Sequence, residues 1–183
     1  MNWRKLRTFL LTVLVLSLIP ATRFREIDAP LLKFFRGPRV DPLSLQLSGE
    51  FVENNLGTEL EADGSVTVRM IAQQYLFIPH CVLVPAGVPV HLRITSADTV
   101  HALSFSETSY KDTNQGETNY AVKASAGAIS EAELQFPRAG EYRTVCREFC
   151  GAGHYAMRSV LKAVPKDQFP VLRPGERGDC AAQ

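Results

Sequence analysis

The sequence has almost no excess charge of either sign and no strong compositional bias. Its 183 residues contain 20 Lys and Arg against 19 Asp and Glu, which gives a formal net charge of +1. Nucleic-acid-binding domains carry clustered excess Lys and Arg, so no nucleic-acid partner is expected. With 45% hydrophobic residues, 12 Gly and 11 Pro, the composition is that of a globular protein. The length suits one ordinary domain plus an anchor.

Cysteine and tryptophan are also scarce. Four cysteines are too few and too unevenly spaced for a disulfide scaffold of this length. Cys81 and Cys180 could pair in an oxidising compartment, but we expect a free, partly buried Cys81 and a disordered Cys180. The sequence contains no Cys-x-x-Cys-His motif, which excludes a covalently attached haem. The one tryptophan is Trp3.

A long apolar run lies at the N-terminus. Residues 8–22 carry no charge and follow a basic stretch that includes Arg7. As a helix they would span ~22 Å, against about 30 Å of bilayer hydrocarbon, so the run fits either a signal peptide or a short membrane anchor. We favour an anchor over residues 1–23, because the candidate cleavage site is poor and the flanking Arg and Trp3 side chains can snorkel. Both alternatives export the rest of the chain.

Prolines punctuate the next segment, so residues 24–60 are predicted to be a linker that becomes the edge of a domain. From Ser65 onward the apolar residues recur with period two. Residues 66–73 and 88–95 are therefore predicted strands with one buried face. Residues 140–145 and 157–164 are predicted to be two more strands.

The segment 104–130 is rich in Ser, Thr, Asn and Gly and is expected to be a long excursion with uncertain pairing. No amphipathic helix pattern competes with the strands. We therefore predict an all-β sandwich over residues 61–166, followed by an irregular tail over 167–183.

Two cysteines four residues apart begin a cluster of soft ligands. The cluster consists of Cys146, Cys150, His154 and Met157. Two thiolates, an imidazole and a thioether suit copper, but a blue copper site needs only one Cys. A second thiolate, bridging two ions, would let two coppers share the site. A second imidazole can come from His101, which we place at the end of the strand that starts near Val88.

Chance is a poor explanation for this spacing. With 4 Cys, 4 His and 3 Met in the chain, random placement at these offsets has a probability of about 3 in 100,000. Zinc is the best rival metal, since Cys2His2 sites are common, but zinc leaves no role for Met157. A disulfide between Cys146 and Cys150 is the other alternative. We favour copper over both.

The run Cys146–Met157 reads C-R-E-F-C-G-A-G-H-Y-A-M. It resembles the C-x-E-x-C-x-x-x-H-x-x-M copper loop of subunit II of cytochrome c oxidase. The stretch S-A-D-T-V-H at 96–101 is similar to that family's Asp-x-x-His segment. Weaker similarity extends over residues 48–164, and the whole resembles bacterial members with a single N-terminal membrane segment.

The resemblance implies a cupredoxin-like Greek-key β-sandwich preceded by one transmembrane or signal-anchor helix. It also implies a binuclear copper centre of the CuA type, with two Cu ions. The family pattern makes Cys146 and Cys150 the bridging thiolates and His101 and His154 the terminal imidazoles. Met157 becomes the axial thioether. Glu148 contributes its backbone carbonyl, and in many relatives its side chain reaches a magnesium site at the junction with subunit I.

The implied function is electron transfer within a haem-copper terminal oxidase. Single electrons would pass from cytochrome c, or another periplasmic donor, to the oxygen-reducing subunit I. The chain would take part in catalysis only within that complex. It would be a single-pass protein of the bacterial inner membrane, with the copper domain on the periplasmic face.

Two alternatives remain open: the CuA module of a nitric or nitrous oxide reductase complex, and a copper-delivery assembly factor. Assembly factors of that kind are thioredoxin-like and need helices that the pattern does not predict. The sequence also departs from mitochondrial relatives, which carry a Trp-rich patch near residues 73–77 where electrons arrive. Tyr75 and Phe77 are candidate substitutes.

Three further polar residues invite a functional reading. His91 is expected to face water, and His80, beside Cys81, is expected to be structural. Asp98 lies three residues before His101. It could accept a hydrogen bond beside the site or simply form a turn, and the sequence does not distinguish the two.

Overall fold

The computed structural model describes residues 38–107 and 120–170, and outside these ranges only Trp3, Arg7, Leu172 and Cys180. Apart from Trp3 and Arg7, the predicted anchor over 1–23 therefore lies outside the described residues. Within the described part, the chain has no helix that is long and apolar enough to span a membrane.

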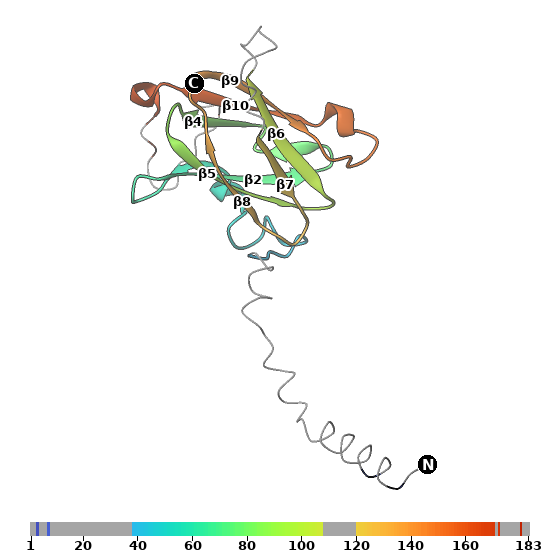
Figure 1. Ribbon diagram of the computed structural model, residues 1–183. Coiled ribbons are helices and arrows are strands. Elements are labelled where there is room, and N and C mark those ends of the chain that lie inside the picture. Colours follow the sequence, from blue (N-terminus) through green and yellow to red (C-terminus); the bar gives the residue numbers. More distant parts are fainter. Residues whose placement is uncertain are drawn as a thin grey trace. The chain divides into compact units, whose positions relative to one another are not determined.

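The described residues form strands joined by turns and short 3-10 helices (Figure 1). In chain order the strands are β1 Gly57–Leu60, β2 Val66–Gln73, β3 Leu76–Ile78, β4 Cys81–Pro85, β5 Pro89–Ser96, β6 His101–Glu107, β7 Tyr120–Ala124, β8 Ser130–Gln135, β9 Gly140–Cys146 and β10 Arg158–Val164. The 3-10 helices are η1 Glu53–Asn55, η2 His154–Ala156 and η3 Lys166–Gln168.

Two sheets stack face to face. The first has the order β1-β2-β5-β8, with β3 paired to β2, and the second has the order β4-β10-β9-β6-β7. The pairs β2–β5 and β4–β10 are parallel, and the other pairs are antiparallel. The cupredoxin-like all-β sandwich predicted from the sequence is confirmed, including strands at 66–73, 140–145 and 157–164.

Inward-facing side chains of both sheets fill the space between them. Phe136 lies at the centre, with its ring 5.4 Å from that of Phe105 and 4.9 Å from that of Tyr142, both in edge-to-face geometry. Each such pair stabilises the fold by about 0.5–1.5 kcal/mol beyond area burial. Tyr142 also donates a hydrogen bond from its hydroxyl to the Arg138 carbonyl at 2.9 Å, which satisfies its buried polar group.

A segment before β1, residues 38–56, covers part of the outer face of the first sheet, and we call it the strap. Leu45, Phe51 and Leu56 of the strap form a second apolar cluster with Ile71 of β2 and Ile129. Because the strap packs there, Ile71 is fully buried. The prediction that β2 has one buried face is therefore wrong: the strap supplies a second apolar surface.

The segment expected to be a loose excursion contains regular structure. β6 pairs with both β7 and β9, and its Leu103 and Phe105 lie in the main core. Ser104 and Ser106 alternate with these two residues and lie on the other side of the sheet, so a segment that is polar on average still forms a strand. Residues 108–119, which join β6 to β7, lie outside the described residues.

Cys81 and Cys180 form a disulfide, so the expectation that both are unpaired is wrong. Cys81 begins β4, an edge strand, and Cys180 lies 99 residues further along the chain. A link that closes so long a loop restricts the unfolded chain, which typically stabilises a fold by about 2–4 kcal/mol.

One carboxylate joins the strap to the sheet. Glu50 accepts hydrogen bonds from the Arg93 guanidinium, one of them at 2.8 Å, and lies 3.4 Å from Arg69 Nε. The hydrogen bonds from Arg93 lower the pKa of Glu50 below its ordinary value, against the opposing effect of burial.

Replacing this carboxylate by an amide tests its role. We expect Glu50→Gln to lower the free energy of unfolding at pH 7 by about 1–3 kcal/mol, since charge-assisted hydrogen bonds are lost. The pKa of Glu50 is lower in the folded state, so its contribution is present above about pH 4.5 and disappears as the pH falls through the folded pKa. Urea unfolding at pH 7 and pH 3 measures this. Glu133→Gln, in exposed β8, is the matched control, and a loss that persists at pH 3 would contradict the electrostatic cause.

Candidate metal centre

The loop between β9 and β10 brings the predicted ligands to one end of the sandwich. Cys146 is the last residue of β9, and its N–H donates to the Met157 carbonyl at 3.2 Å, which closes the loop. Cys146, Cys150 and Met157 are buried, whereas His154, at the start of η2, is partly exposed. The loop therefore presents one side to the core and the other to solvent.

His101 arrives from the neighbouring strand and is fully buried. It is the first residue of β6, not the end of the strand that starts near Val88, because β5 ends at Ser96 and a turn follows. Since Leu103 of β6 pairs with Cys146 of β9, His101 lies directly beside the loop.

Each cysteine has its own histidine. Cys146 Sγ lies 3.8 Å from His101 Nδ1, and Cys150 Sγ lies 3.5 Å from His154 Nδ1. The two sulfur atoms are 4.0 Å apart, and both cysteines are free. The alternative of a Cys146–Cys150 disulfide is therefore not what the structure contains.

Each cysteine also has a weaker donor close to its sulfur atom. The Glu148 carbonyl oxygen lies 3.2 Å from Cys146 Sγ, and Met157 Sδ lies 3.7 Å from Cys150 Sγ. The six donor atoms thus divide into two halves that meet at the sulfur pair. One half adds nitrogen and oxygen, and the other adds nitrogen and a thioether.

The division of the donor atoms into two halves affects how a metal ion can be bound. Among the described residues, the donor atoms of His101, Cys146 and Cys150 all lie within 4.8 Å of one another, and His154 is not a member of that group. A single tetrahedral zinc ion, with bonds of roughly 2.0–2.3 Å, needs all four donors close together. The four donors therefore do not gather into one tetrahedral group of the kind that zinc needs.

The electrostatics also favour a bound cation. Burial raises the pKa of the Cys150 thiol to about 11, and the neighbouring Cys146 adds to the rise. Two thiolates so close together and shielded from water need positive charge to be stable, which soft metal ions supply. The donor set therefore fits a copper centre.

Asp98 orients the buried histidine. Its Oδ1 lies 2.8 Å from His101 Nε2, and its Oδ2 accepts the Gln74 N–H at 2.7 Å. Burial opposes ionisation of Asp98, but hydrogen bonds from His101, Gln74 and Thr99 outweigh it and lower the pKa of the carboxyl. With Nε2 donating to Asp98, Nδ1 presents its lone pair towards the sulfurs. Of the two roles open for Asp98, the hydrogen bond beside the site is confirmed.

The turn after β2 contributes contacts that the sequence did not predict. Gln74 donates its side-chain N–H to the Cys150 carbonyl, and the Tyr75 ring packs against Gly151 and Gly153. A Cβ on either glycine would collide with Tyr75. In the sequence, the two glycines of the loop were therefore the feature that could have indicated a side chain packed closely against it. Tyr75 is 37% exposed, whereas Phe77 is fully buried, so of the two candidate substitutes only Tyr75 reaches the surface beside the loop.

The remaining histidines lie elsewhere. His91 is exposed on β5, as expected. The backbone carbonyl of His80 accepts hydrogen bonds from the Ser159 hydroxyl at 2.6 Å and the Val160 N–H at 3.0 Å, which agrees with a structural role for this segment.

A β-sandwich with a soft-ligand loop at one end defines the class of this domain as cupredoxin-like and metal-binding. Residues 65–164 match the family model of the cytochrome c oxidase subunit II periplasmic domain. Because that match covers more than half of the chain, the chain belongs to the cytochrome c oxidase subunit II family.

The chain is also similar to individual known proteins. Cytochrome c oxidase subunit 2 of Thermus thermophilus is 29% identical over 123 residues, which cover 67% of this chain and 84% of that protein. Among solved structures, a chain of a heme-copper terminal oxidase dimer has a TM-score of 0.46 at 22% identity, covering 86% of this chain and 98% of that one. The periplasmic domain of subunit II of the Bradyrhizobium japonicum cytochrome oxidase has a TM-score of 0.44 at 17% identity, covering 56% and 86%.

Removing the charge beside His101 should weaken metal binding. We expect Asp98→Asn to lower copper affinity by about 10–100-fold, because the amide no longer stabilises the required tautomer and orientation. Competition against a copper chelator measures the affinity of the full-length chain. Glu133→Gln removes a carboxylate from the opposite sheet and should leave the affinity unchanged. Equal affinities for all three proteins would contradict the role of Asp98.

The contact between Tyr75 and the loop can be tested by adding one methyl group. The backbone of Gly153 has φ −90°, which alanine tolerates, so Gly153→Ala should act only through its clash with the Tyr75 ring. We expect a loss of about 1–3 kcal/mol in the free energy of unfolding, measured in urea. The loss should disappear when the same change is made in a Tyr75→Ala background, and a loss of equal size there would refute the contact.

Proposed function

We propose that this chain is the electron-transfer subunit of a haem-copper terminal oxidase, and that its six donors hold a binuclear CuA centre. It takes single electrons from cytochrome c or another periplasmic donor and passes them to the oxygen-reducing subunit I. The observation that carries the proposal is the pairing of each cysteine with its own histidine on either side of a 4.0 Å sulfur pair.

In this proposal the thiolates of Cys146 and Cys150 would hold both copper ions. His101 and His154 would each supply an imidazole, and Met157 and the Glu148 carbonyl would be weaker donors. A centre of this kind would share one added electron between two ions, so that each bond length would change little.

The surrounding residues keep the donors in place. β9 and β10 pair across residues 158–163 of β10 and fix both ends of the loop. Asp98 fixes the ring of His101, and Gln74 fixes the Cys150 carbonyl. Because these contacts exist before any electron arrives, little rearrangement is needed during transfer.

Surface features are consistent with two partners. Tyr75 beside the loop replaces the tryptophan patch of mitochondrial relatives as the place where electrons arrive. Glu148 is exposed, and in the assembled complex its side chain can reach a magnesium ion at the contact with subunit I. We further propose that residues 1–23 anchor the chain in the bacterial inner membrane, with the copper domain on the periplasmic face. Catalysis belongs to the complex, because this chain offers electron transfer alone.

Electron spin resonance of the copper-loaded, oxidised full-length chain tests the proposal. We expect the hyperfine pattern of one unpaired electron shared by two coppers, and its loss in Cys150→Ser, which removes a bridging thiolate. Cys180→Ser is the control. It removes the distant disulfide and about 2–4 kcal/mol of stability, but should keep the shared-electron pattern. A single-copper pattern in the unmodified chain, or uptake of zinc alone, would overturn the proposal.

A further inference from the structure

Ser96 is the last residue of β5 and lies just before the turn that leads to β6. Its side chain continues the inward-facing series of Leu92 and Ile94, because alternate residues of a strand point to the same face. Ser96 pairs with Ala72 of β2, bridges to Ala126, and is fully buried. Water therefore does not reach its hydroxyl, and the hydrogen bonds of that hydroxyl have to be made within the protein.

Both hydrogen-bonding functions of the Ser96 hydroxyl are used by one residue, Asp98. The oxygen accepts the backbone N–H of Asp98 at 3.2 Å, and the hydroxyl donates to Asp98 Oδ1, also at 3.2 Å. A serine that accepts the N–H two residues later is a common way to form a turn. Turn formation explains the first bond but not the second, which directs a proton at the same oxygen that faces His101.

Asp98 Oδ1 is crowded with donors. Besides the Ser96 hydroxyl, it accepts the Thr99 N–H at 2.6 Å and lies 2.8 Å from His101 Nε2. A carboxylate has about four lone-pair sites, two on each oxygen, so three donors compete for the charge on Oδ1. Oδ2 accepts the Gln74 N–H at 2.7 Å. The two backbone donors hold the carboxylate in position, and Ser96 and His101 share the remaining charge on Oδ1.

We propose that Ser96 limits how strongly Asp98 polarises His101, and thereby keeps the reduction potential of the copper centre higher than Asp98 alone would make it. A carboxylate that accepts from Nε2 of a ligand imidazole raises the basicity of Nδ1. A more basic ligand stabilises the oxidised metal more than the reduced metal, because the oxidised metal carries more positive charge. Ser96 draws part of the Oδ1 charge to itself and so opposes this effect.

Ser96 is thus a positioning residue that acts on the centre through Asp98. Its hydrogen bonds to Asp98 belong to the chain itself, whereas their effect on the potential rests on the proposed function. The inference adds to that function a residue that adjusts the potential of the centre.

The neighbouring threonine provides a matched control. Thr95 is also fully buried, but it faces the opposite side of β5, and its hydroxyl donates to the Ala128 carbonyl at 2.8 Å. Ser96→Ala and Thr95→Val each remove one buried hydroxyl from the end of the same strand, so both should lower the stability of the fold. If the Ser96 hydroxyl only supported the fold, the two changes would have the same effect on His101.

The first test needs no copper. Of the four histidines only His101 is fully buried, so its Nε2 proton is shielded from water and can be followed by nuclear magnetic resonance in the metal-free, reduced, isotope-labelled full-length chain. We expect Ser96→Ala to move this signal downfield, because the bond to Asp98 strengthens when Oδ1 has one donor fewer. Thr95→Val should leave it in place. An unchanged signal or an upfield shift in Ser96→Ala, or an equal shift in Thr95→Val, would overturn the inference.

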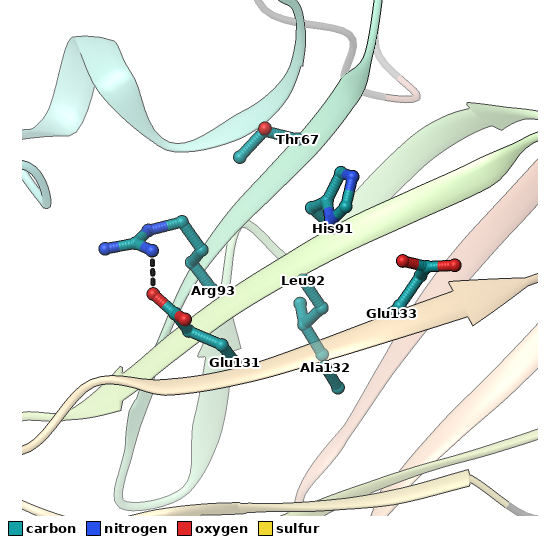
Figure 2. Close-up of a pocket in the computed structure, with 7 residues that line it drawn as sticks. All are labelled: Thr67, His91, Leu92, Arg93, Glu131, Ala132 and Glu133. Atoms are coloured by element: carbon teal, nitrogen blue, oxygen red, sulfur yellow. Dashed lines mark hydrogen bonds and ion pairs between the residues drawn. The ribbon is translucent and has the colours of Figure 1, made fainter. Parts of the chain in front are cut away.

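His91 is the internal reference for this measurement. It is exposed on the outer face of β5, beside Thr67 of β2 and Glu133 of β8, as Figure 2 shows. Because it shares the strand with Ser96 but lies on the other face, its ring signals should be the same in the unmodified chain and in both variants.

The second test is a spectroelectrochemical titration of the copper-loaded full-length chain. We expect Ser96→Ala to lower the midpoint potential, and Thr95→Val to leave it unchanged. Ser96→Thr retains a hydroxyl and should restore the potential of the unmodified chain. Ser96→Gly removes the same hydroxyl and takes the place of Ser96→Ala if that protein does not fold.

A double-mutant cycle shows whether Ser96 acts through the carboxylate. In an Asp98→Asn background, Ser96→Ala should cause no further change in the potential. A further fall of the same size in that background would overturn the inference.

The outcomes separate the two proposals. Absence of the shared-electron pattern defeats the proposed function, while the His101 signal of the metal-free chain still tests the contact from Ser96 through Asp98. A normal pattern with equal potentials for Ser96→Ala and the unmodified chain defeats the role of Ser96 alone.

Discussion

Two thiols held 4.0 Å apart in a buried position are the constraint on which this end of the sandwich depends. Burial and mutual repulsion make the paired thiolates unstable without added positive charge. The fold therefore has to bring imidazoles close to both sulfurs and then keep them from moving. It does so with the β9–β10 pair and with Asp98 and Gln74, two residues that supply no metal ligand in the proposed centre.

The strap extends that support to the far side of the first sheet. Ala97 packs against the second apolar cluster, and its N–H donates to the Ala72 carbonyl at 3.0 Å. Asp98 is the next residue, and it holds His101. A continuous series of packed residues thus connects Glu50 and the strap to the first ligand, so the N-terminal part of the domain helps to define the geometry of a site more than forty residues away in the sequence.

The features that the sequence predicted best are those formed by residues close together in the chain. The donors of the loop follow one another within twelve residues, alternation identified β2 and β5, and β9 and β10 were predicted on either side of the loop. It predicted poorly what depends on distant partners. Gln74 meets Cys150 across 76 residues and Cys81 meets Cys180 across 99, and neither contact leaves a local pattern. β6 and β7 were missed because they are short and the polar residues 108–119 between them dominate the composition of the segment. The burial of Ile71 depends on the strap, whose prolines had suggested a linker.

The Cys81–Cys180 disulfide also has a consequence for maturation. The same chain must oxidise one pair of cysteines and keep the other pair, Cys146 and Cys150, reduced for metal. The second pair is the closer in sequence, and a short loop closes more readily than one of 99 residues. An oxidant that forms the Cys81–Cys180 disulfide can therefore form a Cys146–Cys150 disulfide more quickly, and that disulfide would block metal binding. Assembly of this protein therefore requires that one pair of cysteines is oxidised while the other stays reduced. Metal loading or a reductant must keep Cys146 and Cys150 available.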